Sequence, residues 1–278
     1  MNIIKADILG MCFGVRDALG AMTRVENPDT VTIHGELVHN EQVLVQLRSR
    51  GFQMVGEDER DHIPETGTVM ITAHGISNKE RQRLIEAGKT LVDTTCPLVH
   101  RAHQAAQKLQ DQGFHVLVIG KRGHVEVQGI VEDLHSYDII SIADEVATYP
   151  YDKLGVMCQT TSSERLVREI RQAIDAKNPH AEIRFIDTVC HPTKDHQKAL
   201  EVLIDQVDAM VVVGGKNSNN TKQLKVRCEE RGIPAFHVQG PEELRKEWFV
   251  GVKNVGLTAG TSTLDSTINE VHEALVKM

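Results

Sequence analysis

TLVDTTCPLV at residues 90–99 and IRFIDTVCHP at 183–192 share one pattern, in which an apolar β-branched run ends in Asp-Thr-x-Cys. A third stretch, ADILGMC at 6–12, also ends on a cysteine. After each cysteine comes a helix-like segment and then a short β-branched run closed by glycine. The three runs are VTIHG (31–35), HVLVIG (115–120) and AMVVVGG (209–215). Self-similarity of this kind indicates an internal threefold repeat.

The spacing within the repeat is nearly constant. The cysteine-to-glycine separations are 23, 24 and 24 residues, for the pairs Cys12–Gly35, Cys96–Gly120 and Cys190–Gly214. Further helix-like and strand-like runs follow each glycine in the same order. Polar loops close two strands of each repeat, and they carry His39, His124 and Ser218 after the first strand and His74, Thr160 and Ser262 after the third.

Alternating strands and helices of this length are typical of parallel sheets with helical crossovers. The sequence therefore predicts three small α/β lobes with mainly parallel sheets, in a pseudo-threefold trefoil. We expect lobes at 1–95 with Cys12, 96–189 with Cys96 and 190–278 with Cys190. Parallel sheets bind ligands at the carboxyl ends of their strands, beside helix N-termini. Because the cysteines and polar loops fall at such ends, we expect them to line one central cavity.

Composition and charge argue against several classes of protein. The chain has 278 residues and a formal net charge of −8, so nucleic acid is not expected as a partner. No stretch is apolar enough for a membrane helix, and the N-terminus lacks the regions of a signal peptide. The five cysteines form no C-x-x-C pair and are an odd number. These features predict a cytoplasmic protein without a disulfide framework or a zinc ribbon.

Three converging thiolates at Cys12, Cys96 and Cys190 would suit a cuboidal iron–sulfur cluster with one iron left open. Zinc on three cysteines is an alternative that explains an open site but no redox role. Three buried, inert thiols are a further alternative, but they do not explain matched placement in three repeats. Cys158, within a strand, and Cys228, within a charged helix, are expected to be packing residues.

Hydrogen-bond donors gather in the equivalent loops near predicted helix starts, where phosphate groups bind well. They are His39, His74, His124, Ser218, Asn219, Asn220 and Ser262. Lys216 lies nearby, but GGKNSN lacks the spacing of a P-loop. Glu126, two residues after His124, could carry protons with help from Thr160. The alternative for Glu126 is a solvated carboxylate at a helix N-terminus.

Taken in order along the chain, these motifs resemble the 4-hydroxy-3-methylbut-2-enyl diphosphate reductase family, the last enzyme of the non-mevalonate isoprenoid pathway. The resemblance runs from GMCFGV (10–15) to GLTAGTS (256–262). Between them it rests on LVHN (37–40), AHG (73–75), TCPLV (95–99), GHVEVQG (123–129), QTTS (159–162) and KNSNN (216–220).

The resemblance implies a 4Fe–4S cluster on Cys12, Cys96 and Cys190, and a reductive dehydroxylation to isopentenyl and dimethylallyl diphosphates. It implies that Glu126 relays protons with Thr160 beside it. The diphosphate would be held by His39, His74, His124, Ser218, Asn219, Asn220 and Ser262. A reduced ferredoxin or flavodoxin would supply the electrons. A redox-neutral iron–sulfur hydro-lyase and a cluster-based redox sensor are the competing hypotheses.

Four places depart from the family's usual pattern. Asn219 stands where a serine is usual, Thr261 where alanine is common, and Leu264 where proline is common. His191 and Pro192 follow Cys190 where an aromatic residue is familiar. An amide can still donate to phosphate, so we expect diphosphate binding to survive the change at Asn219.

Overall fold

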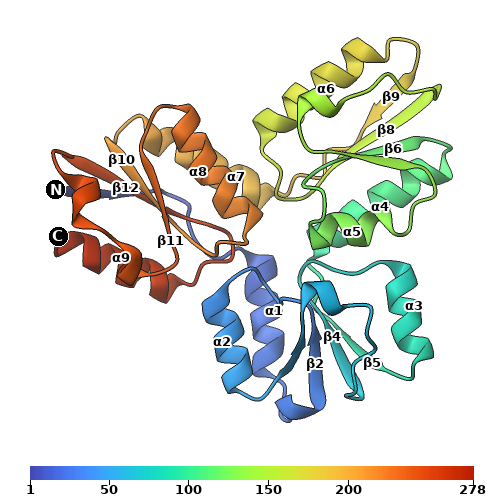
Figure 1. The fold of residues 1–278 in the computed structure, drawn as a ribbon, viewed down its shortest axis with the longest axis horizontal. Helices are drawn as coiled ribbons and strands as arrows, with labels where there is room; N and C mark the ends of the chain where they lie inside the picture. The colour runs from blue at the N-terminus through green and yellow to red at the C-terminus, as the bar shows by residue number, and fades with distance from the viewer. The chain divides into compact units, whose positions relative to one another are not determined.

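The computed structural model describes the backbone of residues 1–278 and every side chain except that of Asp58. Its strands form three sheets of four parallel strands each, which confirms the predicted α/β class (Figure 1). Two compact units are distinguished. One comprises Met1–Arg16, His39–Val43 and His191–Met278, and the other Asp17–Val38 and Leu44–Cys190.

The three sheets have the same strand order when the strands are matched by their place in the repeat. The first is β3-β2-β4-β5, with β2 Val31–His34, β3 Gln53–Val55, β4 Thr68–Ile71 and β5 Thr90–Asp93. The second is β7-β6-β8-β9, with β6 His115–Ile119, β7 Tyr137–Ile140, β8 Lys153–Cys158 and β9 Glu182–Phe185. The third is β11-β10-β12-β1, with β1 Asn2–Lys5, β10 Ala209–Val213, β11 Ala235–Val238 and β12 Asn254–Ala259.

The first strand of the chain completes the last sheet. Asn2 pairs with Asn254 and Lys5 with Leu257, so β1 is the edge strand beside β12. This corrects the boundary drawn at 1–95, because residues 2–5 belong with the lobe formed by the C-terminal residues. The reason is that each repeat ends with a strand that leads into a cysteine. In the third sheet, the strand that leads into a cysteine and lies beside β12 is β1.

Nine α-helices connect and cover the strands. They are α1 Phe13–Thr23, α2 Glu41–Ser49, α3 Asn78–Glu86, α4 Pro97–Asp111, α5 Val125–Val131, α6 Glu164–Lys177, α7 His191–Ile204, α8 Asn219–Glu230 and α9 Asp265–Val276. Five short 3₁₀ segments lie at Pro28–Thr30, Glu57–Glu59, Ala143–Glu145, Pro241–Glu243 and Lys246–Phe249. Helix α5 is the shortest of them, with seven residues.

Helix α4 shows how the amphipathic pattern positions these elements. Val99, Ala102, Ala106 and Leu109 follow the spacing of one helical face, and all four are buried. In the sheet below, every residue of β6 is buried, as expected for a central parallel strand covered on both faces. The cores of the second lobe therefore lie on both faces of its sheet.

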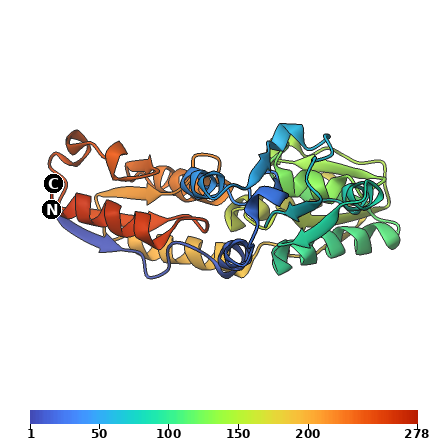
Figure 2. The same ribbon diagram turned by 90° about the horizontal axis from the view of Figure 1, so that it is seen from below.

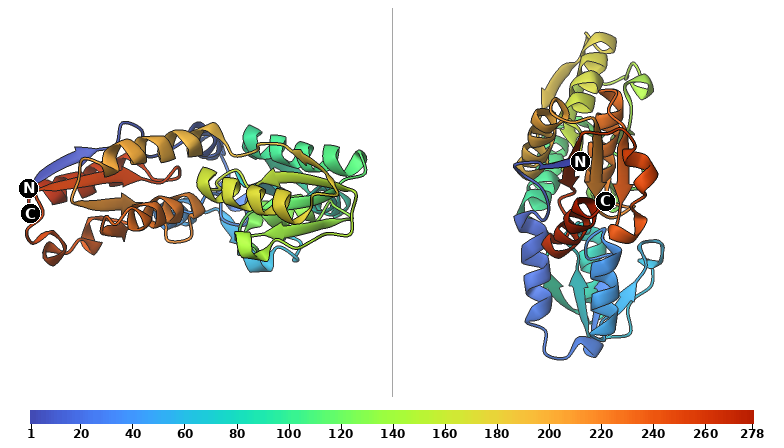
Figure 3. Two further views of the ribbon diagram at one scale, coloured as in Figure 1. Left: turned by 90° about the horizontal axis from the view of Figure 1, so that it is seen from above. Right: turned by 90° about the vertical axis from the view of Figure 1, so that its left-hand side faces the viewer.

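The two chain ends lie close together, at the start of β1 and the end of α9 (Figures 2 and 3). None of the helices in the described part of the chain is long and apolar enough to cross a membrane.

Candidate functional site

The three cysteines of the repeat occupy equivalent places in the fold. Each directly precedes a helix, namely α1, α4 and α7. The backbone N–H of each donates to a carbonyl in the loop after the third strand of its own sheet. The pairs are Cys12–Thr261 at 2.9 Å, Cys96–Ala73 at 3.1 Å and Cys190–Thr160 at 2.9 Å. This shared hydrogen bond places each cysteine beside a predicted ligand-binding loop.

The surroundings of the three thiols suit ligands better than packing residues. All three are half-buried and outside any disulfide. Burial raises the pKa of the Cys12 thiol, while the backbone N–H groups of Val15 and Gly14 act in the opposite direction. Such N–H groups at a helix start favour a thiolate. By contrast, Cys158 and Cys228 are fully buried, which confirms their assignment as packing residues.

A stacked pair of rings links the residues that follow two of the cysteines. Phe13 and His191 have ring centroids 5.5 Å apart and nearly parallel planes. In the chain, Phe13 follows Cys12 and His191 follows Cys190. His191 thus keeps the stacking role of an aromatic residue. No three His, Cys, Asp or Glu side chains among the described residues form a ready metal site, so convergence of all three sulfurs stays a prediction.

Glu126 and Thr160 form a buried pair. The Glu126 side chain lies in the first turn of α5 and the residue is 1% exposed, so it is not the solvated carboxylate of the alternative hypothesis. Its Oε1 accepts from the Thr160 backbone N–H at 2.6 Å, and its Oε2 accepts from the Thr160 hydroxyl at 2.8 Å. A buried carboxyl group needs such partners. Because the Thr160 carbonyl accepts from Cys190, the pair directly adjoins a predicted cluster ligand.

Two histidines lie in the same unit as this pair. His124 is the N-cap of α5, and its Nδ1 accepts from the Glu126 backbone N–H at 3.2 Å. The ring of His74 packs edge-on against the ring of His124, with centroids 5.9 Å apart. The structure thus brings together His74, His124, Glu126 and Thr160, as expected from their loops.

The remaining predicted residues gather in the other unit. A Cβ atom on Gly215 would lie 2.1 Å from the His39 carbonyl oxygen, so the two loops pack backbone against backbone. The Ser262 hydroxyl donates to the same carbonyl at 3.4 Å. Ser218 is the N-cap of α8, with Asn219 and Asn220 in its first turn. His39, Ser262 and the start of α8 therefore share one neighbourhood.

Asn40 is a residue of this neighbourhood that the sequence analysis did not single out. Its Oδ1 accepts from the N–H groups of Gln42 and Val43 at 3.0 and 3.4 Å, which caps α2. Its Nδ2 donates to the Ser262 carbonyl at 2.8 Å. Asn at a helix start is a known capping signal, and it could have identified Asn40 in place of its neighbour His39 as the N-cap.

Asn220 is buried, with 1% exposure, yet neither atom of its side-chain amide has a hydrogen-bond partner within the described residues. A buried amide without partners is costly, and native proteins rarely leave one so. Oxygen atoms of a ligand at the start of α8 would accept from its Nδ2, and a protonated oxygen of the same ligand would donate to its Oδ1. Asn220 is thus the strongest indication of anion binding in this unit.

The hydrogen bonds from the three cysteine N–H groups also show which loop residues are equivalent in the three lobes. Because Thr160 accepts from Cys190 as Ala73 does from Cys96, it corresponds to Ala73 and Thr261. The residue equivalent to His74 and Ser262 is therefore Thr161, one position later than the repeat alone suggested. Counted from each N-cap, Glu126 corresponds to Gln42 and Asn220. Only one of the three equivalent positions carries a carboxyl group.

Comparison with known proteins now separates the alternatives. A family model described as LytB protein matches residues 3–276. The chain belongs to this family. A relative from Ralstonia nicotianae is 34% identical over 99% of this chain and 86% of its own length, and one from Aquifex aeolicus is 33% identical over 98% and 94%. Both are named 4-hydroxy-3-methylbut-2-enyl diphosphate reductase, which confirms the resemblance inferred from the motifs.

Solved structures agree with this membership of the LytB family. The reductase from Plasmodium falciparum superposes with a TM-score of 0.89 at 25% identity, covering 99% of this chain and 88% of that one. A second structure, described as the terminal enzyme of the non-mevalonate pathway, gives 0.69 at 30% identity and covers 100% and 99%. The predicted fold and the predicted enzyme class, an oxidoreductase, are both confirmed.

The departures from the usual LytB pattern leave the backbone contacts in place. Thr261 still accepts the Cys12 N–H, and Leu264 is the N-cap of α9 without a side-chain cap bond. In helix α7, His196 is 3% exposed and its Nδ1 lies 3.1 Å from the Ala259 carbonyl oxygen. Helix α7 turns this face toward the end of β12.

Proposed function

We propose that this protein reduces 4-hydroxy-3-methylbut-2-enyl diphosphate to isopentenyl and dimethylallyl diphosphates. Two electrons and two protons enter, the carbon–oxygen bond to the hydroxyl breaks, and the oxygen leaves as water. The observation that carries the proposal is the buried Glu126–Thr160 pair next to Cys190, within a chain of this family. A carboxyl group held in this way is suited to proton transfer rather than to a surface role.

Cys12, Cys96 and Cys190 would hold a 4Fe–4S cluster. Three thiols at helix starts, equivalent in three lobes, fit a group that needs several thiolate ligands. When bound, the cluster supplies electrons and a Lewis-acidic iron. A reduced ferredoxin or flavodoxin would deliver the electrons.

Glu126 would give protons to the departing hydroxyl and the new carbon–hydrogen bond. Its two oxygens are held by Thr160, so the carboxyl group is oriented before substrate binds. Thr160 can return a proton along the same hydrogen bond, because a hydroxyl both donates and accepts.

The diphosphate would be bound by groups at helix starts. Helix N-termini attract phosphate through free N–H groups and the helix dipole. The side chains would be His39, His74, His124, Ser218, Asn219, Asn220 and Ser262.

Asn220→Ala is expected to raise the KM for the diphosphate about 10- to 100-fold, because a hydrogen bond to a charged group is lost. Steady-state kinetics under anaerobic conditions would measure it. Asn217→Ala is the matched control, since Asn217 is exposed in the same loop. An unchanged KM for Asn220→Ala would contradict the assignment.

Turnover tests the function itself. Protein purified without air, given a dithionite-reduced mediator and the hydroxylated diphosphate, is expected to form both isoprenoid diphosphates. The same reaction without reductant separates the hypotheses, because a hydro-lyase would turn over and a reductase would not. A fully clustered sample that forms neither product with reductant would contradict the proposal and favour a sensor.

A further inference from the structure

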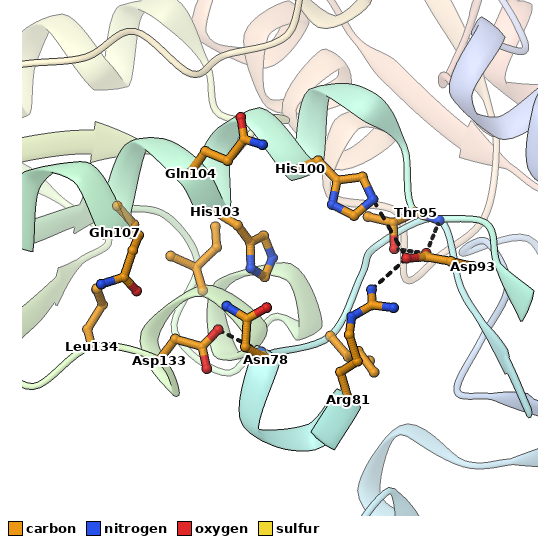
Figure 4. A pocket seen from close by; sticks show the side chains of 13 residues that line it. Asn78, Arg81, Asp93, Thr95, His100, His103, Gln104, Gln107, Asp133 and Leu134 are labelled. Atoms are coloured by element: carbon orange, nitrogen blue, oxygen red, sulfur yellow. Dashed lines mark hydrogen bonds and ion pairs between the residues drawn. The ribbon is translucent and has the colours of Figure 1, made fainter. Parts of the chain in front are cut away.

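A polar pocket of about 310 Å³ is lined in part by Thr95, the residue directly before Cys96 (Figure 4). It is formed by α3, the end of β5, α4 and α5. Arg81, Asp93, Thr95 and His100 line its side next to Cys96. None of these side chains has a place in the proposed reaction, so their arrangement calls for another explanation.

The Asp93 carboxylate organises this side of the pocket. Its Oδ1 accepts from the Thr95 backbone N–H at 2.9 Å and from the Thr95 hydroxyl at 2.5 Å. Its Oδ2 pairs with the Arg81 guanidinium at 2.5 Å, and His100 Nε2 lies 3.8 Å away. The carboxylate therefore closes the turn 93–95 and joins it to helix α3.

The turn at residues 93–95 adjoins Cys96 and contacts the loop that carries His74. Cys96 is the next residue, and it is the N-cap of α4 without a side-chain cap bond of its own. A Cβ atom on Gly75 would lie 3.0 Å from Thr95 Cγ2, so the loop that carries His74 packs on the same turn. Fixing Thr95 thus fixes the position of Cys96 and supports the loop of His74.

The other lobes show that the arrangement is specific. Asp187 stands three residues before Cys190, and its Oδ1 accepts from the Val189 backbone N–H at 3.1 Å. Before Cys12 the equivalent residue is Leu9, whose side chain cannot accept a hydrogen bond, and Gly10 follows with φ of 85°. The loops before Cys96 and Cys190 are thus each held by a carboxylate. The loop before Cys12 instead contains a glycine with positive φ, a conformation that glycine adopts without steric cost.

We infer that Asp93 is a positioning residue for Cys96, holding this loop in the conformation that ligates the cluster, with Asp187 in the same role for Cys190. Arg81 secures the turn to α3 through Asp93. The inference rests on the proposed cluster ligands, and it adds a role for residues that touch neither substrate nor cluster.

The rate at which the loaded protein loses iron tests this positioning role independently of catalytic activity. Asp93→Ala, loaded anaerobically, is expected to lose iron to excess EDTA about tenfold faster than wild type, the effect of one net hydrogen bond. Asp93→Asn is expected to stay close to wild type, because the amide oxygen can still accept from Thr95. Asparagine keeps the hydrogen bond to Thr95 but carries no charge. Iron release near the wild-type rate by Asp93→Asn would therefore show that the hydrogen bond within the turn, and not the ion pair with Arg81, holds Cys96 in place.

Asp208→Ala is the matched control. Asp208 likewise accepts two hydrogen bonds, here from the backbone N–H groups of Lys253 and Asn254, but it precedes β10 and lies away from any cysteine loop. Its loss is expected to lower the unfolding temperature of the apoprotein and leave iron release unchanged. Wild-type release by Asp93→Ala, or release by Asp93→Asn as fast as by Asp93→Ala, would overturn the inference. Wild-type protein that takes up no iron would instead overturn the cofactor assignment.

Discussion

Cys96→Ser is expected to abolish most cluster binding and turnover. Serine cannot supply a thiolate at the start of α4, and the loss of a ligand should exceed the roughly 10- to 100-fold effect of changing a group that only contacts a ligand. Mössbauer spectroscopy and iron analysis of protein purified without air would report the cluster. Product formation with reductant would report the activity.

A substitution at a packing cysteine provides the control. Cys228 is fully buried in α8, and burial together with nearby glutamates raises the pKa of its thiol to about 12. Cys228→Ala is expected to keep iron and turnover and to lose only some stability through a small cavity. If Cys96→Ser retained iron like wild type, the ligand set would be wrong.

Glu126→Gln is expected to reduce turnover by about 100- to 10,000-fold, the usual contribution of a positioned proton donor. The amide has the same shape, and its oxygen can accept from the Thr160 N–H while its nitrogen donates to the Thr160 hydroxyl. The fold and the cluster should therefore survive. Rapid mixing under anaerobic conditions would compare rates at equal cluster content.

Glu132→Gln is the matched control, because Glu132 is an exposed carboxylate at the other end of the same helix. It is expected to act like wild type. Activity of Glu126→Gln near the wild-type level, with the cluster intact, would show that protons reach the substrate by another route.

Much of the fold could be predicted because the strands and helices of each repeat are recognisable from patterns of neighbouring residues. Strand-like runs such as 115–119 and 209–213 are apolar along their length, and the structure buries every residue of both. Helices begin near polar loops and are amphipathic where they cover a sheet. Such patterns depend only on residues close together in the chain, so they can be recognised without knowing which elements pack against one another.

The site was predicted less completely, since its chemistry depends on contacts far apart in sequence. The start of α5 identified Glu126 as a candidate, but the residue that holds its carboxyl group is Thr160, 34 residues away. Asn40 was missed as a cap because His39 matched the repeat spacing better. The burial of His196 was not predicted, because its partner is the backbone carbonyl of Ala259 at the end of β12, 63 residues away.

The sequence by itself determined that three α/β repeats exist, that each presents a cysteine at a strand end, and that polar loops stand beside helix starts. Periodicity and covalent spacing are sufficient for that. Only the tertiary structure decided that β1 completes the sheet of β12 and that Glu126 is held by Thr160. It also decided that Asn220 is buried with no hydrogen-bond partner for its amide among the described side chains. Strand pairing and burial depend on which surfaces meet in space, and the order of residues along the chain does not specify that.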